Sequence, residues 1–220
     1  MNIKNSLKDK IMSVGRVNKY LYNIMSKNNL TPTSEAKWKT QILNNNENIE
    51  WGKIYSNIFQ STIDTTLRSF QYKFLMRIIP TNKLLYKYKY VQSSLCSLCN
   101  SSIESLEHLF WECCKVQPLW KKLNSFIKSK SINIILTKDT ALLSITSNSP
   151  FKSICNTLII LMKYFIFKNK AYEDNLSFEA FHHFLQRRIK IEEQIALDHD
   201  NHDAHSKKWQ IISKISSNNI

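Results

Sequence analysis

The chain has 220 residues, of which 43% are hydrophobic, and it carries a formal net charge of +14 at pH 7. This size and apolar content allow one large or two small domains with a hydrophobic core. Only two glycines and four prolines occur, and this scarcity argues against a strand-rich fold with its many tight turns. We therefore expect a mainly α fold with long helices and little or no β structure.

The longest apolar run lies between Ile154 and Phe167 and is interrupted by polar residues, including Lys163. It is shorter than the about 20 residues that a membrane-spanning helix needs. Residues 1–10 are polar and basic, without the hydrophobic segment of a signal peptide. We therefore expect no membrane partner and an intracellular location, in the nucleus or the cytoplasm, where thiols stay reduced.

Three segments in the first quarter of the chain show the apolar spacing of amphipathic helices. The first covers residues 5–27, and residues 28–33 interrupt the pattern. Trp38 marks the second helix, and residues 51–59 form the third. Their apolar positions are Leu7, Ile11, Val14, Leu21, Met25, Trp38, Ile42, Leu43, Trp51, Ile54, Tyr55, Ile58 and Phe59.

A fourth helix is predicted over residues 65–79, with Thr62 or Asp64 as its N-cap and Pro80 directly after it. It has an apolar face and a basic face, because residues three and four apart lie on the same side of a helix. The apolar face is Leu67, Phe70, Phe74 and Ile78, and the basic face is Lys73 and Arg77.

The stretch from Thr65 to Ile103 contains no acidic residue. Its basic residues are Arg68, Lys73, Arg77, Lys83, Lys87 and Lys89. An ordinary solvated face mixes charges of both signs, so this stretch favours a polyanion partner such as RNA or single-stranded DNA. The alternative is a basic protein without such a partner. Between Tyr86 and Tyr90 lysines alternate with tyrosines. We expect the lysines to contact phosphates and the tyrosines to pack against the zinc module rather than stack on bases.

Residues 96–113 contain the pattern C-x2-C-x8-H-x4-C, formed by Cys96, Cys99, His108 and Cys113. Three thiolates and one imidazole complete the tetrahedral shell of a structural Zn²⁺ site and leave no position for a catalytic water. Cys114 is the alternative last ligand, but the four-residue spacing favours Cys113. A thioredoxin-like redox pair would need a βαβ context, which is missing, and a disulfide framework would need a secreted chain.

Downstream of this motif the apolar spacing predicts four further helices. They cover residues 116–127, 151–170, 178–197 and 206–215. The first of them carries Lys121 and Lys122, which we assign to the same nucleic-acid path. Residues 132–136 form a loop or a short strand, and Cys155 lies in an apolar run typical of a buried side chain.

One further cluster of possible metal ligands is His199, His202 and His205 with the neighbouring aspartates. A single polar run far from other ligands is more often a solvated helix end, so we assign no metal to it.

These elements predict a bundle of amphipathic helices around a small CCHC zinc knuckle. We divide the chain into an N-terminal helical segment (1–60), a basic helix with the zinc module (61–130) and a C-terminal helical segment (131–220).

The residues resemble the zinc-binding segment that follows the polymerase in LINE-type (non-LTR) retrotransposon reverse transcriptases. The resemblance covers about residues 35–170 and is carried by residues 70–83, 95–99, 107–113, Trp120 and 163–166. It implies that the Cys–His set binds zinc and that the basic surface holds template RNA or target DNA during target-primed reverse transcription. Met76 stands where His is common in the family, and Ser144 where Gly is common.

The chain has no adjacent Asp-Asp pair, such as a polymerase uses for two Mg²⁺ ions, and no glycine-rich phosphate loop. We therefore expect no catalytic residues, and we expect a carboxy-terminal part of a larger polyprotein. Two alternatives remain open: a structural module that contacts the upstream polymerase domains, and a decayed remnant without function.

Overall fold

The computed structural model describes residues 31–42, 49–170, 176–198 and 202–213. Within these ranges the chain forms ten helical segments and no sheet, which confirms the prediction of a mainly α fold. The predicted helix over residues 5–27 lies outside the described residues. The helical segments are α3 (Thr33–Ile42), α4 (Trp51–Ser61), α5 (Thr65–Leu75), α6 (Asn82–Lys87), the π-helical turn η1 (His108–Glu112), α7 (Gln117–Ser129), α8 (Lys138–Leu142), α9 (Lys152–Asn169), α10 (Phe178–Asp198) and α11 (His202–Ser213).

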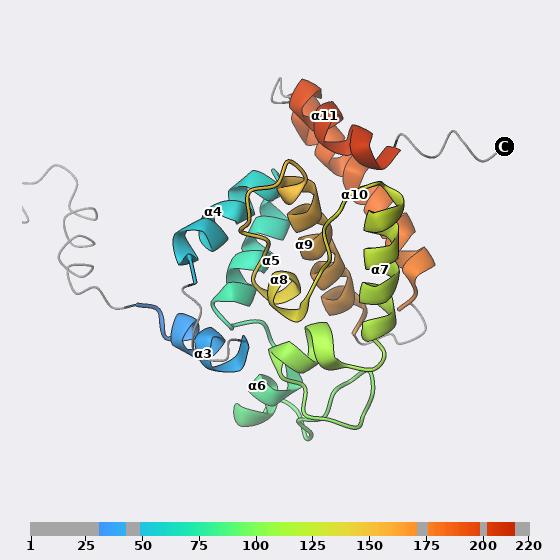
Figure 1. The fold of residues 1–220 in the computed structure, drawn as a ribbon. Coiled ribbons are helices and arrows are strands. Elements are labelled where there is room, and N and C mark those ends of the chain that lie inside the picture. Colours follow the sequence, from blue (N-terminus) through green and yellow to red (C-terminus); the bar gives the residue numbers. More distant parts are fainter. Residues whose placement is uncertain (1–30, 43–48, 171–175, 199–201, 214–220) are drawn as a thin grey trace, which may run out of the picture.

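Helix α9 lies in the middle of the molecule, with α4 and α5 on one side and α7 and α10 on the other (Figure 1). Twelve of its eighteen residues are buried. This explains the nearly continuous apolar sequence of α9, because a helix covered on several sides needs no polar face. Among the residues that the structure describes, no helix has both the length and the apolar character to span a membrane.

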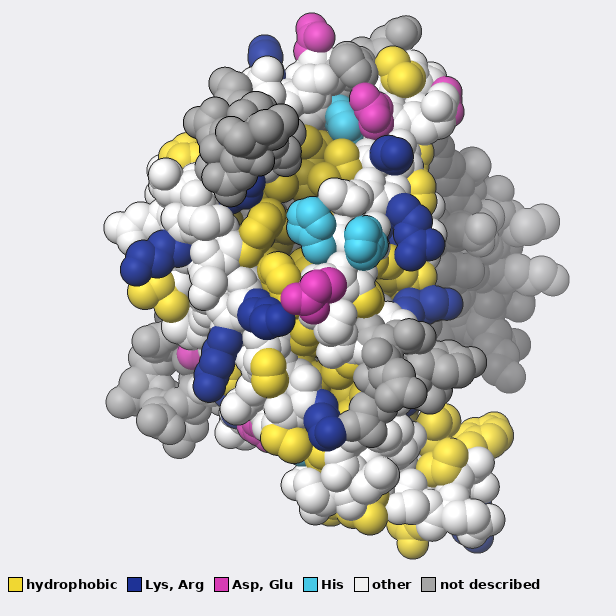
Figure 2. Space-filling model, turned by 90° about the vertical axis from the view of Figure 1, so that its right-hand side faces the viewer, with side chains coloured by type: hydrophobic (Ala, Val, Ile, Leu, Met, Phe, Trp, Pro, Cys, Tyr) yellow, Lys and Arg dark blue, Asp and Glu magenta, His cyan; other side chains and the backbone are white. Residues whose placement is uncertain are grey.

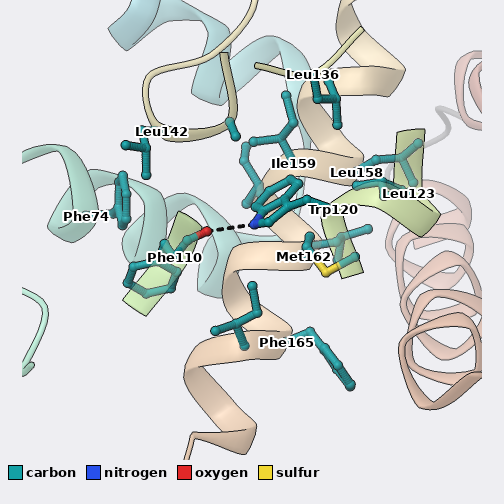
Figure 3. Close-up of a cluster of buried hydrophobic side chains, with 14 of the residues drawn as sticks. Phe74, Phe110, Trp120, Leu123, Leu136, Leu142, Leu158, Ile159, Met162 and Phe165 are labelled. Carbon is teal, nitrogen blue, oxygen red and sulfur yellow. Dashed lines mark hydrogen bonds between the residues drawn. The ribbon is translucent and has the colours of Figure 1, made fainter. Parts of the chain in front are cut away.

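The core joins α9 to the segment that carries the Cys–His motif. Trp120 of α7 packs among Leu158, Ile159 and Met162 of α9, and its Nε1 donates a hydrogen bond of 2.7 Å to the carbonyl oxygen of Phe110 in η1 (Figure 3). The ring of Phe110 in turn meets Phe74 of α5 edge to face, with centroids 5.0 Å apart. One buried cluster therefore contains residues from each of the three segments into which the sequence was divided.

The fourth predicted helix is shorter than its apolar pattern indicated. Its N-cap is Asp64, whose Oδ1 accepts hydrogen bonds from the backbone N–H of Thr66 and Leu67. The helix ends at Leu75 instead of Ile79, because Arg77 adopts a left-handed conformation with φ of 59°. Ile78 is consequently 55% exposed and does not belong to the apolar face.

Two short helices, α6 and α8, were not predicted. Both begin with a threonine N-cap, Thr81 and Thr137, whose side chain accepts a hydrogen bond from a backbone N–H of the first turn. Residues 132–136 form a loop, not a strand. The other predicted helices correspond to α3, α4, α7, α9, α10 and α11 within a few residues at their ends.

Candidate metal centre

Cys96 and Cys99 lie in a tight turn between two extended residues. Leu95 and Ile103 form an isolated antiparallel bridge, and the N–H of Cys96 donates to the carbonyl of Ser102 at 2.7 Å. Asn100, whose N–H bonds the carbonyl of Cys96, has a φ of 52°. Asparagine tolerates this left-handed conformation better than most residues, and the reversal of the chain points both sulfurs to the same side.

His108 and Cys113 lie at opposite ends of the π-helical turn η1. The N–H of Cys113 donates to the carbonyl of His108 at 2.8 Å, which is the i to i+5 bond of a π-helix. In a regular α-helix two residues five apart point in different directions. The wider turn brings them into line, and this is the structural meaning of the four-residue spacing between the two ligands.

The four side chains converge on one point. Their potential ligand atoms all lie within 4.8 Å of one another. Cys96 Sγ lies 3.9 Å from Cys113 Sγ, and Cys99 Sγ lies 3.3 Å from His108 Nε2. A tetrahedral ion with sulfur ligands at about 2.3 Å and a nitrogen ligand at about 2.0 Å would separate its ligand atoms by about 3.5–3.8 Å. The arrangement therefore fits a four-coordinate metal ion.

The surroundings of the four ligands also suit a closed structural site. Cys96 and Cys113 are fully buried and His108 is 9% exposed. Cys114, the alternative last ligand, is exposed and is not part of the cluster. Cys155 is buried in α9, as the sequence indicated.

The protonation of the thiols shows how the site would respond to a metal ion. The hydrogen bond with Cys113 lowers the pKa of Cys96 to about 5, and the same interaction raises the pKa of Cys113. Without metal this interaction favours the thiolate on Cys96 and the proton on Cys113. Because metal ligands must be deprotonated, a bound ion would take the place of this proton.

Residues 19–120 match the family model for zinc-binding in reverse transcriptase. The matched segment covers slightly less than half of the chain and contains all four residues of the cluster. A comparison with curated proteins found no match. The donor set and this family match agree on a metal-binding segment.

Glu104 links several parts of this segment through hydrogen bonds. Nothing in the sequence indicated this role, apart from the position of Glu104 directly after the stretch without acidic residues. Its side chain is completely buried. Oε2 accepts hydrogen bonds from the N–H and the hydroxyl of Ser97, and Oε1 accepts from the N–H of Asn82 and from Lys170 Nζ at 2.9 Å. Burial raises the pKa of Glu104, but these hydrogen bonds outweigh it and lower the pKa overall. One carboxylate thus connects the Cys96–Cys99 turn to α6 and to the end of α9.

Arg77 is the predicted nucleic-acid contact whose environment departs most from an open basic face. Its Nη1 lies 2.6 Å from Glu107 Oε1, and its guanidinium lies 4.3 Å from the ring centroid of Trp38. The side chain is only 13% exposed. Arg77 therefore links α3 to the residue directly before η1, instead of lying with Lys73 on an open basic face.

The other predicted basic residues fall into three groups. Arg68 donates to the carbonyls of Thr62 and Phe59 and lies over the Phe59 ring. Lys122 of α7 lies 3.1 Å from Glu179 of α10. The exposed residues for which the structure records no ion pair within its described ranges are Lys73, Lys83, Lys87, Lys89 and Lys121.

The tyrosines that alternate with these lysines are exposed, so the expectation that they pack against the zinc module was wrong. Tyr86 is 52% exposed, Tyr88 60% and Tyr90 79%. The short helix α6, which contains Tyr86 and precedes the other two tyrosines, buries none of its residues. The leucines of α6, Leu84 and Leu85, are themselves only half-buried, and the fully buried side chains beside the helix are those of Thr81 and Glu104. Helix α6 therefore has no buried face on which the tyrosine rings could lie. The three tyrosines and the two lysines between them are therefore all exposed.

Proposed function

We propose that this chain is a non-catalytic, Zn²⁺-binding module that binds RNA or single-stranded DNA. It would be the carboxy-terminal zinc-binding part of a LINE-type (non-LTR) retrotransposon reverse transcriptase and would support target-primed reverse transcription. The observation that carries the proposal is the convergence of Cys96, Cys99, His108 and Cys113 within a segment that matches a reverse-transcriptase zinc-binding family.

The chemistry of the donor set supports zinc over other ions. Three sulfurs and one imidazole nitrogen are soft ligands, which Zn²⁺ accepts and Mg²⁺ or Ca²⁺ does not. The shell already has four protein ligands, so the ion would cross-link the chain without activating a water molecule. The metal would thus fix the loop that presents the exposed basic and aromatic side chains.

The surface of this module has the composition of a single-strand binding site. Lys83, Lys87 and Lys89 of α6 and the turn after it are exposed, as are Tyr88 and Tyr90, and Lys87 Nζ lies 5.8 Å from the centroid of the Tyr88 ring. Lysines contact phosphates at any sequence, and aromatic rings stack on unpaired bases. Duplexes hide their base faces, which favours RNA loops or single-stranded DNA as the ligand.

The direct test combines metal analysis with nucleic-acid binding. The purified protein should contain one Zn²⁺ per chain, and its affinity for a single-stranded oligouridine should fall after chelation and return when zinc is restored. Lys73, Lys83, Lys87 and Lys89 changed together to Glu should abolish binding, whereas Lys37, Lys39, Lys128 and Lys207 changed to Glu should not. Unchanged binding by the first variant would rule out this surface.

A second candidate function is a platform for protein contacts with upstream polymerase domains. The observation in its favour is the exposure of apolar side chains on the same module, with Ile103 at 54% and Leu95 at 42%. Apolar side chains that gather on a surface mark protein contacts more often than scattered ones do. Tight association with the polymerase segment in the absence of RNA binding would favour this function over the first.

A further inference from the structure

A cavity of about 670 Å³ lies between α9 and α10, outside the matched segment. Its size is within the range of about 300–1,000 Å³ that is usual for small-ligand sites. The cavity is lined by Tyr164, Phe165, Lys168, Asn169, Ala180, His183, Phe184, Arg187 and Arg188. We call it the α9–α10 cleft.

The lining of the cleft is basic. Lys168 of α9 and Arg187 of α10 are exposed, and within the described part of the chain no ion pair involves either residue. His183 is also exposed, and none of the nine lining residues is acidic. Figure 2 shows this side of the molecule, where histidines lie near Lys and Arg side chains, with apolar atoms and some acidic side chains among them. Such an arrangement attracts an anionic ligand.

The wall of the cleft is aromatic and firmly held. The rings of Tyr164 and Phe184 lie 6.2 Å apart. The guanidinium of Arg188 lies 5.1 Å from the centroid of the first ring and 5.3 Å from that of the second. An ion pair of 2.9 Å with Asp64 fixes Arg188 in this position. An anionic ligand with an aromatic base would therefore meet the Arg188 guanidinium held on these two rings, beside the exposed Lys168 and Arg187.

The cleft also adjoins residues 81–113, which carry the Cys–His cluster and which we call the Cys–His module. Lys170, which follows α9, donates to the carbonyl of Pro80 and to Glu104 Oε1, both at 2.9 Å. Lys168 lies in the last turn of the same helix. The end of α9 therefore carries one cation of the cleft and also contacts the loop that leads into α6.

We infer that the α9–α10 cleft binds one nucleotide unit, base and phosphate together, of the single strand that the Cys–His module holds. This inference rests on the proposed function and adds a second contact to it. A strand fits the cleft better than a free nucleotide does. Tight nucleotide sites surround the phosphate with backbone N–H groups of a glycine-rich loop, whereas the lining here contains no glycine and its cations are exposed.

The test compares two double variants with the same change in net charge. Lys168→Glu with Arg187→Glu alters the cleft, and Lys37→Glu with Lys39→Glu alters exposed lysines of α3, far from it (Figure 1). The probe is a fluorescent single-stranded oligouridine. The cleft variant should bind at least about tenfold more weakly, and the slope of log affinity against log salt should fall by about 0.7, because the contact with one phosphate is lost. The α3 variant should retain the wild-type slope.

A second measurement identifies the contact directly. Ultraviolet cross-linking of an iodouridine-containing strand, followed by mass spectrometry, should label Tyr164, His183 or Phe184. Circular dichroism checks the fold of the cleft variant, and Lys168→Gln with Arg187→Gln replaces it if the reversal of charge disturbs the helices.

The outcomes separate this inference from the proposed function. If the wild type binds and the two double variants bind equally well without labelling of the cleft, the inference is overturned while the proposed function stands. If the cleft variant loses binding and the variant with Lys73, Lys83, Lys87 and Lys89 changed to Glu does not, the strand occupies the cleft without the Cys–His module. This result would overturn the surface assigned in the proposed function and the inference that both sites hold one strand. Competition by uridine monophosphate at the concentration of the strand would overturn the assignment to a strand, and absence of binding by the wild type would overturn both.

Discussion

The Cys–His module and the helices packed around α9 are neighbours that different interactions stabilise. Helix α9 buries twelve of its residues, nine of them apolar. Helix α6 of the module buries none of its residues. The turn that contains Cys96 and Cys99 is held by the hydrogen bonds of Ser97 with Glu104 and adjoins the Cys–His cluster. Polar contacts and a potential metal site thus distinguish the module, although Leu98, Leu109 and Phe110 join it to the apolar core on which the bundle depends.

This difference has a consequence for stability. Apolar burial contributes about 25 cal/mol per Å² and is spread over many contacts that need no particular partner atom. A set of buried charges and thiols is stable only when every member is satisfied. The two regions should therefore respond to different perturbations, although Phe110 and Trp120 connect them.

The largest effect should follow removal of the metal ion. Structural zinc binding is worth about 10–16 kcal/mol in small peptides, and without it such modules unfold. We expect chelation or Cys99→Ser to abolish amide protection over residues 82–113 while residues 152–169 stay protected. Hydrogen exchange measured by mass spectrometry separates the two regions.

Cys114→Ser is the matched control for this experiment, because Cys114 is exposed and adjoins the ligand Cys113. It should leave the metal content and the exchange pattern unchanged. Equal loss of protection in both regions after chelation would contradict the separation between module and bundle.

A smaller but global effect is expected for Phe74→Ala. Phe74 is fully buried and contacts Trp38, Phe70 and Phe110. Its removal should lower the free energy of unfolding by about 3–5 kcal/mol, because it leaves a cavity in the core. Chemical denaturation of the zinc-loaded protein measures this. Phe59→Ala, at a site that is 66% exposed, should cost far less, and a similar cost for both would show that the core does not depend on Phe74.

The success of the sequence analysis also differs between the two regions. Apolar periodicity predicted the long helices because burial of one face selects for it. It overextended the fourth helix, because Arg77 leaves helical geometry and pairs with Glu107, thirty positions away along the chain. Helix α6 has no buried face and so no periodicity to detect.

The ligand cluster was predictable because metal geometry restricts the spacing of residues along a short segment. Glu104 was not, since its partners Asn82 and Lys170 lie 22 and 66 positions away. Charge sign likewise predicted a basic surface but could not distinguish Lys87, which is exposed, from Arg77, which is paired. Local spacing is visible in a sequence, and pairing between distant residues is not.

Glu104→Gln should destabilise the module by about 3 kcal/mol, because it leaves Lys170 without its buried counter-charge. The pKa of this carboxyl is lowered in the folded protein. Its contribution is therefore present above the unfolded pKa, near 4.5, and is lost as the pH falls through the lowered folded pKa. Denaturation of wild type and variant at a series of acidic pH values should show the difference shrinking. Asp203→Asn, at an exposed position, serves as a control, and a difference between wild type and Glu104→Gln that does not change with pH would contradict this role of the charge.

The smallest expected effect is a gain in stability, and it concerns the bundle. Lys163 is fully buried in α9, where its Nζ donates to the carbonyl of Leu142 and lies 4.2 Å from the ring centroid of Phe74. Burial lowers the pKa of Lys163 well below 10.5. Lys163→Met should stabilise the protein by about 1–2 kcal/mol near neutral pH, because no charge or amine must be desolvated on folding.

The pH dependence gives this last prediction its sharper form. Between the lowered folded pKa of Lys163 and 10.5 the unfolded chain binds one more proton than the folded one, so wild-type stability should rise with pH over this window. The rise should be absent in Lys163→Met and present in a control, Lys168→Met, whose side chain is exposed. If Lys163→Met instead destabilised the bundle at every pH, the ammonium group would have a favourable role there, and polar contacts would matter in α9 as they do in the Cys–His module.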